Sequence, residues 1–342
     1  MNNYYKVTNS HFYSLDATKF LCALLVVGIH VQPFGDRLFD GYLFTTLCRV
    51  AVPFFFVVSG YLFFKRKAAL IKYVKRLLFI DVIWTTIEFP YIYYKFFVLY
   101  DGNISESIIQ LFNSLIWGES YMGSWFIHAS WEGMIVFCLL NKFLKQPLLY
   151  TICLFFFILA LIDTSYKFLI IGTSVEQLFD TIFRYIVPSG SFIVAVPYFF
   201  IGKCLSENDN DNFRATVLFL FFVLLFGLMV EAFLCRRLYG SEINSVENPR
   251  FEHYILLAPF TYYMVRVLLW SKMHIVGNIS LLLRRLSILI FLCHQPIIVI
   301  LYKISNLQMS IFAYFIVCLL SITCSFVIIS LSDRFKFLKK LY

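Results

Sequence analysis

Long apolar stretches separated by short polar connections dominate the chain. A helix of about 20 mostly apolar residues is long enough to cross the hydrocarbon core of a bilayer. Runs of this length, or nearly so, recur about ten times along the 342 residues. They cover residues 17–35, 42–64, 77–99, 124–143, 147–163, 185–205, 213–235, 253–270, 282–302 and 308–331. The pattern predicts an all-α polytopic membrane protein with about ten transmembrane helices.

Two of the longer connections carry apolar stripes and predict amphipathic helices lying in the membrane interface. The stripes are SIIQLFNSLIW, within residues 100–123, and QLFDTIF, within residues 164–184. No connection exceeds about twenty-five residues, which is far short of a soluble domain. We therefore expect a single integral membrane domain over residues 1–342, so that any activity belongs to the membrane bundle itself.

The basic residues of the connections predict the orientation of the chain. With the N-terminus inside, 18 Lys and Arg residues fall on the cytoplasmic side and 8 on the outer side. An excess of basic residues is typical of cytoplasmic connections. Both termini are therefore expected in the cytoplasm. The first apolar run has no small-residue cleavage site, so we expect it to stay in the mature protein.

Composition agrees with a membrane protein and excludes other classes. The chain is 61% hydrophobic and only 14% charged, whereas about a quarter of the residues of soluble domains are charged. The net charge of +9 does not indicate a nucleic-acid partner, because the basic residues lie mostly in short connections. The nine cysteines lie mostly inside apolar runs and form no CxxC pair, so we interpret them as small buried hydrophobes.

The first apolar run carries ionisable groups near both of its ends. In LDATKFLCALLVVGIH, residues 15–30, Lys19 and His30 are eleven positions apart and share one helix face. They lie about 16 Å apart along the helix axis. Ionisable groups inside a membrane are costly and indicate function. A neutral imidazole can take a proton from a hydroxyl, so His30 is a candidate general base. The alternative is a helix-end histidine bonded to a carbonyl or a headgroup.

Three further ionisable residues fall inside apolar runs and are candidate substrate-binding groups. Arg49 opens RVAVPFFFVVSGYLFFKRK and stays protonated, so it needs a partner or a polar cavity. His128 and Glu132 are four residues apart, so Glu132 could orient the imidazole or balance Arg49. A metal site is not expected, since HEXXH is missing and closely spaced ligands are too few.

A cationic cluster precedes the third run. Lys72, Lys75 and Arg76 either mark the cytoplasmic side over anionic lipid or bind the phosphates of a nucleotide-bearing cofactor. Near the C-terminus, SILIFLCHQPI places Ser287 and His294 seven residues apart on one helix face. A Ser-His nucleophile pair is conceivable there, but no third, orienting carboxylate lies nearby in the sequence.

Taken together, these segments resemble the acyltransferase 3 family of integral membrane acyltransferases. LDATKFLCALLVVGIH is similar to the family's first-helix pattern of a basic residue, ten residues and a histidine. RVAVPFFFVVSGYLFF resembles its second helix, KYVKRLLFI the basic start of its third, SWFI its fourth, YFFIGKCL a later FFxxG segment, and SILIFLCHQP a late histidine-proline motif. Two positions depart from the family pattern. Lys19 stands where arginine is commoner, and Phe291 stands where tyrosine is commoner, which speaks against a catalytic role for His294.

The resemblance implies transfer of an acyl group, usually acetyl, from cytoplasmic acetyl-CoA to a hydroxyl of a cell-surface or lipid-linked glycan. His30 would be the catalytic histidine and Lys19 its charged helix partner, with Lys75 and Arg76, beside Lys72, near the phosphates of the coenzyme. The expected location is a bacterial-type plasma (inner) membrane, crossed several times. The chief alternative is a transporter of a small polar solute or lipid-linked sugar that performs no acyl chemistry. A structural subunit of a cell-envelope assembly is a third hypothesis.

Overall fold

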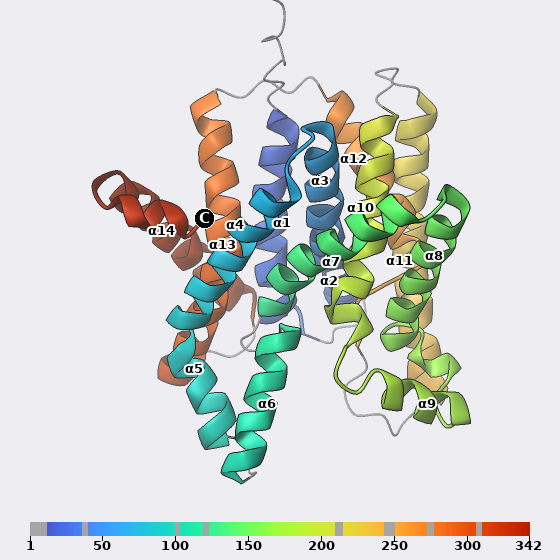
Figure 1. The fold of residues 1–342 in the computed structure, drawn as a ribbon, viewed down its shortest axis with the longest axis horizontal. Helices are drawn as coiled ribbons and strands as arrows, with labels where there is room; N and C mark the ends of the chain where they lie inside the picture. The colour runs from blue at the N-terminus through green and yellow to red at the C-terminus, as the bar shows by residue number, and fades with distance from the viewer. Residues whose placement is uncertain are drawn as a thin grey trace, which may run out of the picture.

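The computed structural model describes residues 12–35, 40–99, 103–118, 123–208, 215–242, 250–271, 277–305 and 310–342. Within these ranges the regular structure is entirely helical, and Figure 1 shows the helices gathered into one bundle. The all-α prediction is therefore confirmed.

Each of the ten apolar runs forms a helix or a short series of helices. The first five give α1 (Tyr13–Val31), α2 (Asp40–Arg49) with α3 (Ala51–Lys65), α4 (Leu70–Ile87) with α5 (Phe89–Tyr94) and the π-helix η1 (Lys95–Leu99), α7 (Ser124–Phe143) and α8 (Gln146–Asp163). The last five give α10 (Phe192–Glu207), α11 (Ala215–Glu242), α12 (Leu257–Trp270), α13 (Gly277–Ser305) and α14 (Ile311–Arg334).

Six spans in the described ranges are long and apolar enough to cross a membrane. They are residues 13–31, 41–65, 146–163, 215–238, 277–302 and 311–334. The expected number of ten membrane crossings is thus not confirmed, and the cytoplasmic placement of both termini stays a prediction.

Proline explains why two of the runs are divided. Pro53 lacks an N–H group and leaves the carbonyl of Arg49 without a helical partner, so α2 ends there and α3 begins at Ala51. Pro90 similarly lies in the first turn of α5, just after α4 ends. The first break matters for function, because it places Arg49 at a helix end.

Two helix pairs form the centre of the bundle. α1 packs along α13, and α3 packs along α10. Glycines allow the second pair to approach closely: a Cβ added at Gly202 would lie 2.6 Å from the backbone nitrogen of Tyr61 and 2.9 Å from the carbonyl carbon of Gly60. No side chain fits at that distance, so backbone meets backbone in the core.

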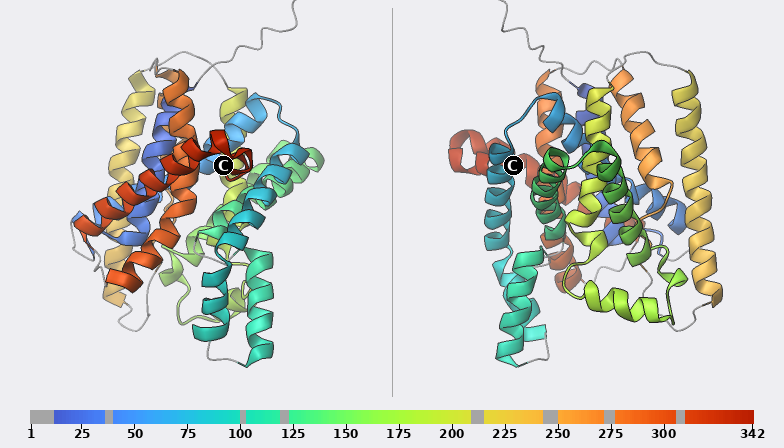
Figure 2. Two further views of the ribbon diagram at one scale, coloured as in Figure 1. Left: turned by 90° about the vertical axis from the view of Figure 1, so that its left-hand side faces the viewer. Right: turned by 45° about the vertical axis from the view of Figure 1, so that its right-hand side comes forward.

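The two amphipathic connections also form helices, as predicted. α6 (Ile104–Trp117) and α9 (Ser174–Ile182) lie at the lower end of the bundle in Figure 1. α9 lies across that end, whereas α6 runs alongside α5 and projects with it beyond the other helices (Figure 2). Three short 3₁₀ turns complete the described structure: η2 (Lys167–Leu169), η3 (Pro188–Gly190) and η4 (Lys336–Lys340).

Candidate functional site

Two imidazole rings face each other where α1 packs along α13. The ring centroids of His30 and His294 lie 5.3 Å apart, with the rings tilted by 38°. His294 is fully buried, and its Nδ1 lies 3.1 Å from the carbonyl oxygen of Ile290. A neutral ring that donates from Nδ1 to this carbonyl keeps a lone pair on Nε2. His30 is only partly buried and faces His294 inside the bundle. The structure therefore brings together a reachable imidazole and an enclosed one.

Further polar atoms without partners lie next to the enclosed histidine. Among the described residues, nothing bonds to Nε2 of His294 or to either amide atom of the buried Gln295. Buried polar groups normally find partners, because leaving one unpaired costs about 1–3 kcal/mol. This concentration of unpaired atoms is typical of a place that binds a polar ligand.

Arg49 forms an ion pair with Glu252 close to the histidines. Its Nη1 lies 3.6 Å from Oε1 of Glu252, which is in the segment just before α12. Both charged groups act electrostatically on His30. The sequence suggested Glu132 as the partner of Arg49, and the structure shows Glu252 instead. The reason is tertiary, since Glu252 and Arg49 are far apart in the chain.

A second guanidinium holds Glu252 from the other side. Nη2 of Arg250 lies 3.4 Å from Oε2 of Glu252 and donates to the hydroxyl of Ser189 over 2.9 Å. Burial raises the pKa of Glu252, but Arg49 and Arg250 outweigh that effect and hold the pKa at about 2. Glu252 is therefore ionised at neutral pH and compensates the positive charge beside His30.

Lys19 lies in a separate cluster on the same helix as His30. Its Nζ is 3.6 Å from Oδ1 of Asp16, whose other oxygen accepts the hydroxyl of Ser280 over 2.7 Å and lies 4.0 Å from Nε of Arg284. Because α1 is continuous, Lys19 and His30 stay about 16 Å apart along its axis. Lys19 thus stands beside the contact between α1 and α13, at the opposite end from the imidazoles.

His128 has a different partner from the one that its sequence spacing suggested. Its Nδ1 lies 2.8 Å from Oδ2 of Asp81 on α4, so Asp81 rather than Glu132 is its ion-pair partner among the described residues. Glu132 acts electrostatically with both groups, and the ring of Trp131 lies 5.1 Å from the imidazole. In the described ranges, no hydrogen bond or ion pair joins this cluster to Arg49 or His30.

The cationic cluster of Lys72, Lys75 and Arg76 is exposed on the first turns of α4. Within the described part of the chain, none of the three forms an ion pair with a carboxylate. α4 begins on the side of the bundle where α1 begins, whereas His30 lies near the end of α1 (Figure 1). Cations and imidazoles therefore occupy opposite sides of the bundle.

Sequence reasoning missed several residues of this arrangement. His294 was interpreted as a weak candidate, yet it is the direct neighbour of His30. The hydroxyl of Ser287 donates to the carbonyl of Arg284 over 2.8 Å, and no hydrogen bond in the described ranges joins it to His294, so the Ser-His pair stays an untested prediction. Only CHQP, the motif that contains His294 and Gln295, signalled this region in the sequence.

An all-helical membrane bundle with an imidazole pair on one side and exposed cations on the other suits chemistry inside the bilayer. Comparison with known proteins defines the class further. The model of a family described as "Acyltransferase domain" matches residues 12–330, so the chain belongs to the acyltransferase 3 family. The resemblance seen in the sequence is thereby confirmed.

Curated relatives of the chain carry different names. An amino-acid racemase of Enterococcus faecalis is 25% identical over 333 residues, which cover 93% of this chain and 45% of the relative. A serine/alanine racemase of Enterococcus gallinarum is 22% identical over 328 residues, which cover 90% of this chain and 44% of the relative. The chain thus spans less than half the length of these relatives. No solved structure is significantly similar to it.

Proposed function

We propose that the chain is a membrane O-acyltransferase that transfers acetyl from acetyl-CoA to a hydroxyl of a cell-surface or lipid-linked glycan. Family membership supports acyl transfer in general. The observation that carries the proposal is the contact between His30 and His294 inside the bundle, beside unpaired polar atoms. Acyl transfer to a hydroxyl needs a base of this kind at a place that water does not fill.

His30 acts as the general base in this mechanism. The acceptor hydroxyl gives its proton to the imidazole of His30 while its oxygen attacks the thioester carbonyl carbon. The C–S bond of the tetrahedral intermediate then breaks, and the imidazolium returns the proton to the departing thiolate. A positioned base of this kind accelerates such reactions about 10²–10⁴-fold. His294 holds the ring of His30 in place, since its own Nδ1 is tied to Ile290.

The charges around His30 suit the developing negative charge of the intermediate. Arg49 provides a fixed cation nearby, and the buried amide of Gln295 offers a donor for the oxyanion. Glu252 limits the positive charge so that it does not prevent protonation of His30. The acceptor sugar binds among these groups.

The donor approaches from the opposite side of the bundle. Lys72, Lys75 and Arg76 bind the phosphates of coenzyme A, because they are exposed and form no ion pair with a carboxylate of the described ranges. The pantetheine arm then carries the thioester into the bundle toward His30. The excess of basic residues on this side supports a donor side in the cytoplasm, and the membrane of the proposal is a bacterial-type inner membrane.

Transport of a small polar solute is a second candidate function, and the names of the relatives favour it. Two relatives are named for racemisation of amino acids, while this chain matches less than half of each. A membrane module joined to such an enzyme could carry the amino acid to it. The unpaired polar atoms around His294 would then bind a solute instead of an acceptor hydroxyl.

Proteoliposomes containing the purified chain separate the two functions. An acyltransferase moves labelled acetyl from acetyl-CoA to an added glycan acceptor and loses this activity in His30→Ala, whereas Ser287→Ala, whose hydroxyl bonds only within its own helix, stays active. A transporter instead accumulates labelled serine or alanine and leaves acetyl-CoA intact. Accumulation without thioester loss would overturn the acyltransferase proposal.

A further inference from the structure

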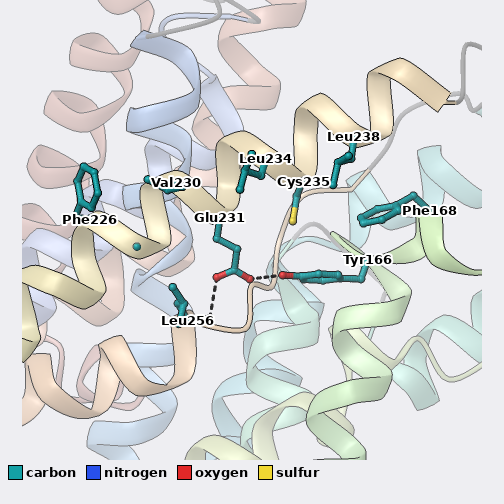
Figure 3. A pocket seen from close by; sticks show the side chains of 10 residues that line it. Tyr166, Phe168, Phe226, Val230, Glu231, Leu234, Cys235, Leu238 and Leu256 are labelled. Carbon is teal, nitrogen blue, oxygen red and sulfur yellow. Dashed lines mark hydrogen bonds between the residues drawn. The ribbon is translucent and has the colours of Figure 1, made fainter.

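Glu231 is a partly buried carboxylate that the proposed reaction does not use. It lies midway along α11, a helix whose outer face is apolar and largely exposed, as Phe226 and Leu234 illustrate. Beside it is a cavity of about 490 Å³ between α11, Tyr166, Phe168 and Leu256, and among the described residues that line it Glu231 is the only acidic one (Figure 3). A carboxylate in such surroundings is costly and indicates a role.

The oxygens of Glu231 are occupied by donors from elsewhere in the chain. Oε1 accepts the hydroxyl of Tyr166 and the backbone N–H of Ile255, each over 2.5 Å, and Oε2 accepts the backbone N–H of Leu256 over 2.9 Å. Figure 3 shows the carboxylate reaching from α11 to both neighbours. Hydrogen bonds to an ionised acceptor are stronger than neutral ones. Glu231 therefore fixes the backbone at the start of α12.

The backbone that Glu231 holds is the segment that carries Glu252. Ile255 lies only three residues beyond Glu252, so the anchored peptide groups and the ion pair with Arg49 belong to one short, non-helical stretch. Such a stretch has no helical hydrogen bonds of its own to fix it. Its position must come from neighbouring elements.

A second residue of α11, Arg236, contacts Phe251 at the beginning of this non-helical stretch. The guanidinium of Arg236 lies 5.2 Å from the ring centre of Phe251 and 4.3 Å from that of Tyr42 on α2. Since α2 ends at Arg49, α11 contacts both elements that provide the Arg49–Glu252 pair. Cation–π contacts of this kind contribute most where water is excluded.

We propose that Glu231 is a positioning residue that holds Glu252 against Arg49 and so sets the charge around His30. The inference rests on the proposed acyl transfer for its kinetic test, but its structural test does not. α11 thereby supports the segment that carries Glu252, and the carboxylate of Glu231 explains how a helix with a largely exposed apolar face influences the reaction.

Hydrogen–deuterium exchange on the full chain in detergent gives the structural test. In Glu231→Gln, one accepting oxygen becomes an amide donor, so the amides of residues 250–256 should exchange at least about tenfold faster. Tyr166→Phe is the matched control, because it removes one donor but leaves both backbone contacts, and it should leave that exchange close to wild type. Unchanged exchange in Glu231→Gln would overturn the proposal.

Kinetics then separate positioning from simple loss of structure. Glu231→Gln should lower acyl transfer about tenfold, and combining it with Glu252→Gln should cost no more than Glu252→Gln alone, because both act through one ion pair. If the double variant instead loses activity by the product of the two single-variant factors, Glu231→Gln causes a general structural defect, and the proposal is contradicted. If Glu231→Gln does not yield folded protein, Arg236→Gln replaces it as the test variant, because it removes the contact between α11 and Phe251. Combining Arg236→Gln with Glu252→Gln should likewise cost no more activity than Glu252→Gln alone. If amide exchange at residues 250–256 rises in Glu231→Gln but the wild-type protein transfers no acyl group, the acyltransferase function is refuted. The positioning of Glu252 by Glu231 is then still supported.

Discussion

Replacing Glu252 by glutamine tests the charge balance of the site most quantitatively. The pKa of this carboxyl falls from an ordinary value of 4.5 to about 2, which corresponds to about 3 kcal/mol of stabilisation of its ionised form. The side chains of Glu252 and Arg49 are each 21% exposed, so solvent screens the pair only in part. We expect Glu252→Gln to destabilise the folded protein at pH 7 by about 2–3 kcal/mol, since it leaves Arg49 partly buried without its partner.

The pH dependence of this loss has a definite sign. A carboxyl with a lowered folded-state pKa stabilises the protein fully above its unfolded value near 4.5, and this contribution is lost as the pH falls toward 2. The difference between wild type and Glu252→Gln should therefore shrink to about half by pH 3. Thermal unfolding in detergent at both pH values measures it. Asp180→Asn is the control, because the exposed Lys167–Asp180 pair should contribute little. Equal stability of Glu252→Gln and wild type at pH 7 would refute the reasoning.

Three further predictions follow from the site and the fold. Lys75→Ala combined with Arg76→Ala should raise KM for acetyl-CoA about tenfold in initial-rate kinetics and leave kcat nearly unchanged, because two phosphate contacts are lost; an unchanged KM would limit the cluster to a topological role. His294→Leu should lower kcat at least about tenfold in the same assay, since it removes the ring that faces His30; a wild-type kcat would remove His294 from the site. Gly202→Ala should sharply reduce the amount of folded protein measured by size-exclusion chromatography, because the added Cβ would lie 2.6 Å from the backbone nitrogen of Tyr61. Gly277→Ala is the control and should leave that amount unchanged, because a Cβ added there has no described atom within 4 Å.

Apolar periodicity was sufficient to predict the helices. Each apolar run became helical, and the breaks after Arg49 and before Pro90 follow from the chemistry of proline. The number of membrane crossings was harder to predict. α4, for example, contains Lys72, Lys75, Arg76 and Asp81 and therefore does not qualify as a span by composition.

Pairings between distant segments could not be predicted from spacing along the chain. The sequence offered Glu132 as a partner either of His128, which is one helical turn away, or of Arg49. Asp81 and Glu252 hold those positions instead, because helix packing brings them closer. The same limit applies to His294, whose importance depends on how α13 lies against α1.

Release of free coenzyme A tests the central claim most directly. Purified protein in lipid is mixed with acetyl-CoA and a glycan acceptor, and the liberated thiol is measured with a thiol-reactive dye for wild type, His30→Ala and Ser287→Ala. Acceptor-dependent thiol release by wild type and Ser287→Ala, reduced at least about a hundredfold in His30→Ala, is the result that we predict. Undiminished release in a correctly folded His30→Ala protein would contradict the assignment of His30 as the base.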